Sequence, residues 1–179
     1  MVYLFLADGF EEIEALIPLD LLRRADIPVR TVGIGTEYPC GAHGISVIAD
    51  LVDEQVNFSD MTALILPGGM PGTLNLEKSA VVQTALKQAT RDCLPIAAIC
   101  AAPSILGHAG YLSGRKATCY PGFQDALFDA TYIDQSVVTD GNIITAKGAG
   151  VALEFSLELI KRLSSQDRVN EIRSAIQCR

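Results

Sequence analysis

The stretch Ile96-Ala97-Ala98-Ile99-Cys100-Ala101-Ala102-Pro103 is an apolar run that ends at a cysteine and continues into small residues and a proline. The run predicts a buried strand, and the small residues with Pro103 predict the tight start of a helix. At such a turn, the positive end of a helix dipole and free backbone N–H groups would favour the Cys100 thiolate and could hold an oxyanion. The alternative is a plain core cysteine, because free cysteine is among the most buried residue types.

Apolar strands alternate with amphipathic helical stretches on both sides of this turn, a pattern typical of a mostly parallel sheet with helices on both faces. We expect strands at residues 2–7, 29–34, 63–66 and 116–119, a short excursion at 45–48, and a hairpin at 137–145. We expect helices at residues 11–25, with a kink at Pro18, and at 80–90, 103–108, 153–163 and 166–176. The sequence therefore predicts one α/β domain over residues 1–179, with its ligand site at the carboxyl ends of the parallel strands.

Composition excludes several classes of protein. A formal net charge of −7 and a pI near 4.7 argue against a nucleic-acid-binding surface. No apolar stretch approaches the roughly 20 residues of a membrane span, and the opening of the chain resembles no export signal, so we expect a cytoplasmic protein. The five cysteines are odd in number and widely spaced. This spacing predicts free thiols in a reducing compartment, with no disulfide framework and no metal or CxxC site.

Two further loops at predicted carboxyl ends of strands carry candidate residues. The segment Gly9-Phe10-Glu11-Glu12-Ile13-Glu14 opens a helix, and dipole complementation explains Glu11 and Glu12. Glu14 lies further along and can point toward the strand ends, although a solvated glutamate is the alternative interpretation. The loop Leu66-Pro67-Gly68-Gly69 can bring backbone N–H groups close to a ligand, or it can be an ordinary turn. It lacks the spacing of a phosphate-binding loop.

Taken in this order and spacing, the three segments resemble the ThiJ/PfpI superfamily, and within it the Parkinsonism-associated deglycase (DJ-one) subgroup. The resemblance extends through Cys119-Tyr120-Pro121, Asp140-Gly141, residues 144–150 and Glu154-Phe155, and so covers nearly the whole chain. It implies a flavodoxin-like three-layer sandwich that usually forms a homodimer and needs no cofactor or metal.

The same resemblance implies roles for individual residues. Cys100 would be the nucleophile, Glu14 the proton donor and acceptor that hydrogen-bonds it, and the N–H groups of Gly69 and Ala101 the oxyanion site. Because two neighbouring anions repel, a Cys100 thiolate is best tolerated if Glu14 keeps its proton.

The chain departs from the family pattern at several positions. Tyr120 stands where several relatives carry a histidine, so a Cys-His pair is not expected. Ala102 replaces a frequent glycine, and Gly148-Ala149-Gly150 replaces a pattern that often has a central proline. His43 lies in a loop where relatives often have an arginine facing the partner's site. We therefore treat His43, with Gly68 and Tyr120, as candidate pocket residues and expect a structural role for His108.

Two functions remain open at this point. In the first, Cys100 attacks a reactive dicarbonyl such as methylglyoxal or glyoxal, and Glu14 moves a proton to give a hydroxy acid without glutathione or metal. Reversal of early glycation adducts on proteins is a related activity that the resemblance implies. In the second, the protein is a redox sensor or redox-regulated chaperone in the oxidative stress response, whose Cys100 oxidises to sulfenic and sulfinic acid. A cysteine protease or amidotransferase is disfavoured because no histidine directly follows Cys100.

Overall fold

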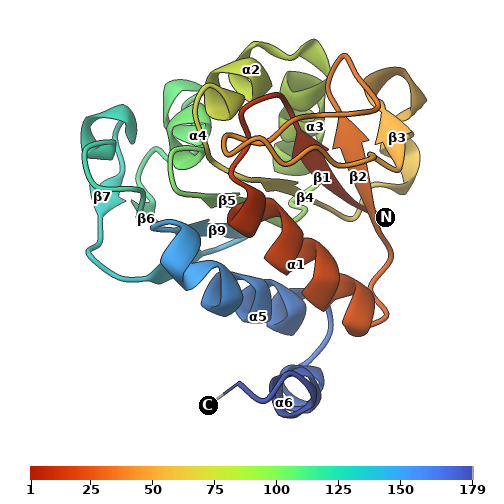
Figure 1. Ribbon diagram of the computed structural model, residues 1–179. Helices are drawn as coiled ribbons and strands as arrows, with labels where there is room; N and C mark the ends of the chain where they lie inside the picture. The colour runs from red at the N-terminus through yellow and green to blue at the C-terminus, as the bar shows by residue number, and fades with distance from the viewer. Residues whose placement is uncertain (179) are drawn as a thin grey trace.

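A seven-stranded sheet forms the centre of the computed structural model, which describes residues 1–178 (Figure 1). Its strands are β1 (Val2–Leu6), β2 (Val29–Gly33), β3 (Leu51–Val52), β4 (Ala63–Leu66), β5 (Ile96–Ile99), β8 (Val137–Asp140) and β9 (Ile143–Ala146). They lie in the order β3-β2-β1-β4-β5-β9-β8, and within this sheet all pairs are parallel except β8 with β9. The predicted hairpin around Asp140-Gly141 is therefore confirmed.

Helices cover both faces of the sheet. They are α1 (Glu12–Arg24), α2 (Gly72–Lys78), α3 (Ala80–Arg91), α4 (Pro103–His108), α5 (Ala152–Leu163) and α6 (Gln166–Ala175). Figure 1 shows α1 and α5 against one face, and α2, α3 and α4 against the other. The predicted flavodoxin-like three-layer sandwich is confirmed. No helix within residues 1–178 combines the length and the apolar character needed to cross a membrane.

The side chains of β1 contribute to the hydrophobic clusters on both faces of the sheet. Its residues alternate between the faces, so that Val2, Leu4 and Leu6 join the cluster beneath α1 and α5, whereas Tyr3 and Phe5 join the cluster beneath α3 and α4. All five side chains are at most 2% exposed. Full burial of a large apolar side chain contributes about 1.5–3 kcal/mol, so both layers hold the strand in register.

Several local predictions differ from the structure. Residues 45–48 form no strand; Ser46 makes an isolated bridge with Cys40, and Ile45 and Ile48 are exposed. The edge of the sheet is instead the two-residue strand β3, which is too short to show a period in the sequence. The strand expected at 116–119 is shorter, because β6 (Lys116–Ala117) pairs in parallel with β7 (Thr131–Tyr132) and then ends.

Candidate functional site

Cys100 occupies the turn between β5 and α4 that its sequence context predicts. Its φ of 65° lies in the left-handed region, which is uncommon for residues other than glycine. The Cys100 N–H donates to Ala146 O at 2.9 Å, and the Tyr120 N–H donates to Cys100 O at 2.8 Å. Hydrogen bonds on both sides of the residue therefore hold the thiol at the carboxyl end of β5.

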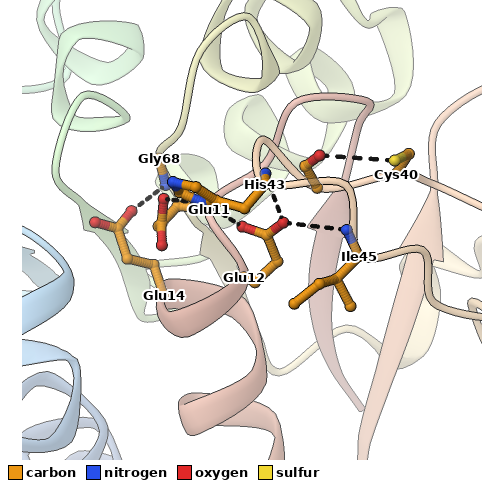
Figure 2. A network of polar contacts seen from close by, with 8 residues as sticks. Glu11, Glu12, Glu14, Cys40, His43, Ile45 and Gly68 are labelled. Atoms are coloured by element: carbon orange, nitrogen blue, oxygen red, sulfur yellow. Dashed lines mark hydrogen bonds and ion pairs between the residues drawn. The ribbon is translucent and has the colours of Figure 1, made fainter.

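Glu14 reaches the same place from the first turns of α1, and its side chain is almost completely buried. Its Oε2 accepts the Gly68 N–H at 2.9 Å (Figure 2). The carboxyl group also hydrogen-bonds the Cys100 thiol and accepts the N–H of Ala149. One carboxyl group thus joins three loops, which leave β4, β5 and β9.

The Gly68-Gly69 turn completes the site with backbone atoms. A Cβ at Gly68 would lie 2.7 Å from the Cys100 Cβ and 2.7 Å from Glu14 Oε2, so no side chain fits there. Gly69 has a φ of 90°, and its N–H donates, with that of Ala101, to the Cys100 sulfur. When a substrate bonds to the sulfur, these two N–H groups would be placed to donate hydrogen bonds to the oxyanion of that adduct instead.

A thiol at a helix N-terminus is expected to have a lowered pKa, but the pKa values of Cys100 and Glu14 are both raised. Burial raises the pKa of Glu14 to about 7. Burial and the Glu14 carboxyl raise the pKa of Cys100 to about 12, against the opposite effect of the Ala101 and Gly69 N–H groups. Above neutral pH the pair therefore holds one proton, which rests mainly on the Cys100 sulfur. A nucleophilic thiolate forms without charge repulsion when Glu14 holds that proton.

His43 contacts the two acidic residues at the start of α1. His43 Nδ1 lies 2.8 Å from Glu12 Oε2 and 3.5 Å from Glu11 Oε2, and the His43 N–H donates to Glu12 Oε1 at 2.8 Å (Figure 2). Tyr120 lies at the rim of the Cys100 site, because its N–H donates to Cys100 O and a Cβ at Gly148 would lie 3.2 Å from its ring and 3.7 Å from Glu14 Oε1. The structure thus brings Cys100, Glu14, Gly68, Gly69, Ala101 and Tyr120 together and leaves His43 in a neighbouring cluster.

Glu12 is the residue of that cluster that sequence reasoning missed. Instead of facing solvent at the helix start, its side chain is buried and binds the loop that follows β2. A Cβ at Gly41 would lie 2.3 Å from the Glu12 carboxyl carbon, so the loop closes directly over it. Its partners His43 and Ile45 are 31 and 33 residues away in the sequence, so no local sequence pattern predicts these hydrogen bonds.

Glu11, Glu12 and His43 bring three potential metal ligands within 4.8 Å of one another. Both Glu12 oxygens already contact groups of the loop, and the positive end of α1 opposes a cation. We therefore assign this cluster a structural role. His108, for which we expect a structural role, places its Nδ1 2.6 Å from Glu77 and its ring against Phe128.

A sequence model described as the DJ-1/PfpI family matches residues 1–162. The chain is 36% identical over 170 residues to protein dj-1beta of Drosophila melanogaster, covering 93% of this chain and 91% of that protein. It is 37% identical over 167 residues to the deglycase PfpI of Pyrococcus furiosus, covering 91% and 99%. The structure of oxidized Toxoplasma gondii DJ-1 superposes with a TM-score of 0.94 at 33% identity, covering 98% of this chain and 97% of that one.

Proposed function

The chain belongs to the DJ-1/PfpI family, and from this premise we propose that it is a cysteine-dependent enzyme that converts reactive 1,2-dicarbonyls to hydroxy acids. The single observation that carries the proposal is the hydrogen-bonded pair of Cys100 and Glu14 beneath the N–H groups of Gly69 and Ala101. A relative that is 37% identical to this chain is named a deglycase, which supports a related activity on glycated proteins.

The reaction begins when the Glu14 carboxylate takes the proton of the Cys100 thiol, which places the negative charge on sulfur. The thiolate attacks the aldehyde carbon of methylglyoxal, and the Gly69 and Ala101 N–H groups hold the oxyanion that forms. Glu14 gives its proton to that oxygen, which leaves a neutral hemithioacetal and a Glu14 carboxylate.

Glu14 then acts as the base. Its carboxylate removes the proton from the former aldehyde carbon, which gives an enediolate, and returns it to the neighbouring carbonyl carbon. The hydroxyl proton on the first carbon passes to the oxygen of the second, so that the first carbon is oxidised to a thioester carbonyl and the second is reduced to an alcohol. The resulting thioester reacts with water to release lactate and regenerate the thiol. The balance is one methylglyoxal and one water to one lactic acid, with no external oxidant, reductant, glutathione or metal.

A redox sensor or redox-regulated chaperone is the second candidate function. Cys100 is only partly buried, and a protonated Glu14 could donate a hydrogen bond to a sulfinate on this sulfur. The relative from Toxoplasma gondii has been solved in an oxidized form. Cys40, Cys93, Cys100 and Cys119 are free thiols, which agrees with the proposed cytoplasmic location.

We also propose a homodimer. Ile13, Ile45 and Ile48 are 47–71% exposed, and an apolar groove lies where α1 meets α5 and the chain after α6. Exposed apolar surface of this kind is typical of protein interfaces. Light scattering after gel filtration would test the proposal, and a monomeric mass for the wild type would contradict it.

The experiment that tests the enzymatic function measures lactate formed from methylglyoxal without glutathione or amine buffer. We expect many equivalents of lactate per subunit from the wild type and none above background from Cys100→Ser. Cys93→Ser is the matched control, because it changes an exposed cysteine outside the site and should retain turnover. Full turnover by Cys100→Ser would overturn the mechanism, and no turnover by the wild type would favour the redox function.

A further inference from the structure

The surface beside the catalytic pair contains a shallow apolar depression, and we infer that it binds an apolar substituent of the substrate. The inference rests on the proposed function and deepens it, because it names the substrate class. The preferred substrates would be 1,2-dicarbonyls of the form R–CO–CHO in which R is an aryl or branched alkyl group, rather than glyoxal itself.

The depression is lined by Tyr120 and Pro121 on one side and by residues 147–151 on the other. Its volume is about 310 Å³, at the lower end of the range of about 300–1,000 Å³ for small-ligand pockets. Glyoxal and methylglyoxal carry only a hydrogen or a methyl group at this position, so they would leave most of the space to water.

The depression is continuous with the reacting atoms. A point at the Cβ position of Gly148 lies 3.2 Å from the Tyr120 ring and 3.7 Å from Glu14 Oε1. Glu14 also accepts the N–H of Ala149, and the Tyr120 N–H donates to Cys100 O. A substrate whose aldehyde carbon bonds to the Cys100 sulfur, with its second carbonyl beside Glu14, can therefore lay its substituent across Gly148 against the Tyr120 ring.

The chemistry of the lining selects for uncharged groups. Of the residues that line the depression, Lys147 alone carries a charge, and its amine is paired with Asp134. Tyr120 is 49% exposed, so an aromatic or branched substituent would cover apolar surface that water now contacts. A carboxylate or phosphate on the substituent would have to compete with Asp134 for the amine.

The test compares kcat/KM for phenylglyoxal, which would give mandelate, with kcat/KM for glyoxal, which would give glycolate. Tyr120→Ala and Val151→Ser should each lower the phenylglyoxal-to-glyoxal ratio, the former by about tenfold, in line with the loss of apolar contacts in a specificity pocket. Tyr120→Phe keeps the ring and should preserve the ratio. Phe128→Ala is the matched control, because Phe128 has a similar exposure of 52% and does not line the depression.

An unchanged ratio in Tyr120→Ala and Val151→Ser would overturn the inference. So would a changed ratio that accompanies a change in molecular mass, because the depression would then belong to a subunit interface. A second measurement separates this failure from failure of the proposed function. Acetophenone, an aryl ketone that offers no aldehyde, should slow alkylation of Cys100 by iodoacetamide more than acetone does, and Tyr120→Ala should remove the difference. That result would support the subsite even if no dicarbonyl were turned over, and equal protection by both ketones would contradict it.

Discussion

Glu12 and Glu14 lie two residues apart on the first turn of α1, and both are nearly inaccessible to solvent, with exposed fractions of 4% and 1%. Their acidities nevertheless shift in opposite directions. For Glu12, burial acts to raise the pKa, but hydrogen bonds from the His43 ring and from backbone N–H groups outweigh it and lower the pKa. For Glu14, burial dominates and raises the pKa to about 7.

The difference shows that burial alone does not decide the charge of a carboxyl group. Glu12 faces a loop that offers several donors, and so it is a permanent anion that ties the chain together. Glu14 faces a thiol and fewer N–H groups, and so it can gain or lose a proton near neutral pH. One helix turn thus supplies a structural carboxylate and a proton carrier.

The largest expected effect follows from removing the proton carrier. Glu14→Gln keeps a hydrogen-bond donor to the sulfur but cannot move a proton, so we expect methylglyoxal turnover to fall by about 100-fold or more. Lactate formation measures the change. Glu54→Gln, at an exposed position, is the control and should turn over at the rate of the wild type. Equal rates for Glu14→Gln and the wild type would remove the acid-base role of Glu14.

The pH dependence of stability should also distinguish the two carboxyl groups. The folded-state pKa of Glu14 lies above the ordinary value of 4.5, so its contribution to stability is complete below pH 4.5 and is lost as the pH rises through about 7. The loss amounts to about 3 kcal/mol, because a change of one in a pKa corresponds to about 1.36 kcal/mol of free energy. Urea unfolding at pH 4.5 and pH 8 should show this decline in the wild type and a smaller one in Glu14→Gln. An identical decline in both proteins would assign it to other groups.

Removing the structural carboxylate should affect stability at neutral pH. Glu12→Ala leaves the N–H groups of His43 and Ile45 without their acceptor, and we expect a loss of about 2 kcal/mol in the free energy of unfolding at pH 7. Glu12→Gln retains an acceptor and should lose less. Urea unfolding measures both, and an unchanged stability of Glu12→Ala would show that water replaces the lost contacts.

The smallest expected effect concerns His43. The hydrogen bond to Glu12, with the charges of Glu11 and Glu12, raises the pKa of His43 above the ordinary 6.5. In Glu12→Gln this pKa should fall toward 6.5, since the charge of Glu11 alone remains. An NMR titration of the His43 ring protons would detect the shift. A His43 pKa that does not move would mean that the imidazole leaves Glu12 in solution.

The central fold was predictable because β1, β4 and β5 are continuous apolar runs and the Cys100 turn follows β5. The site was predictable in outline, since parallel strands bring their carboxyl ends to one edge. The helix α2 was missed because Gly72 and Asn75 weaken the helical signal in a seven-residue segment. The binding of the loop by Glu12 was missed for a different reason. Its partners are remote in sequence, and a glutamate at a helix start has a sufficient local explanation.

The left-handed backbone of Cys100 has a consequence for how the chain balances durability against chemistry. Glycine adopts this conformation without the crowding that a Cβ introduces, so at this one position the residue best suited to the backbone is not the residue present. Selection for thermal stability alone would favour glycine at position 100, and the reactive thiol would then be lost. Cysteine at this turn is thus a local concession of stability to reactivity.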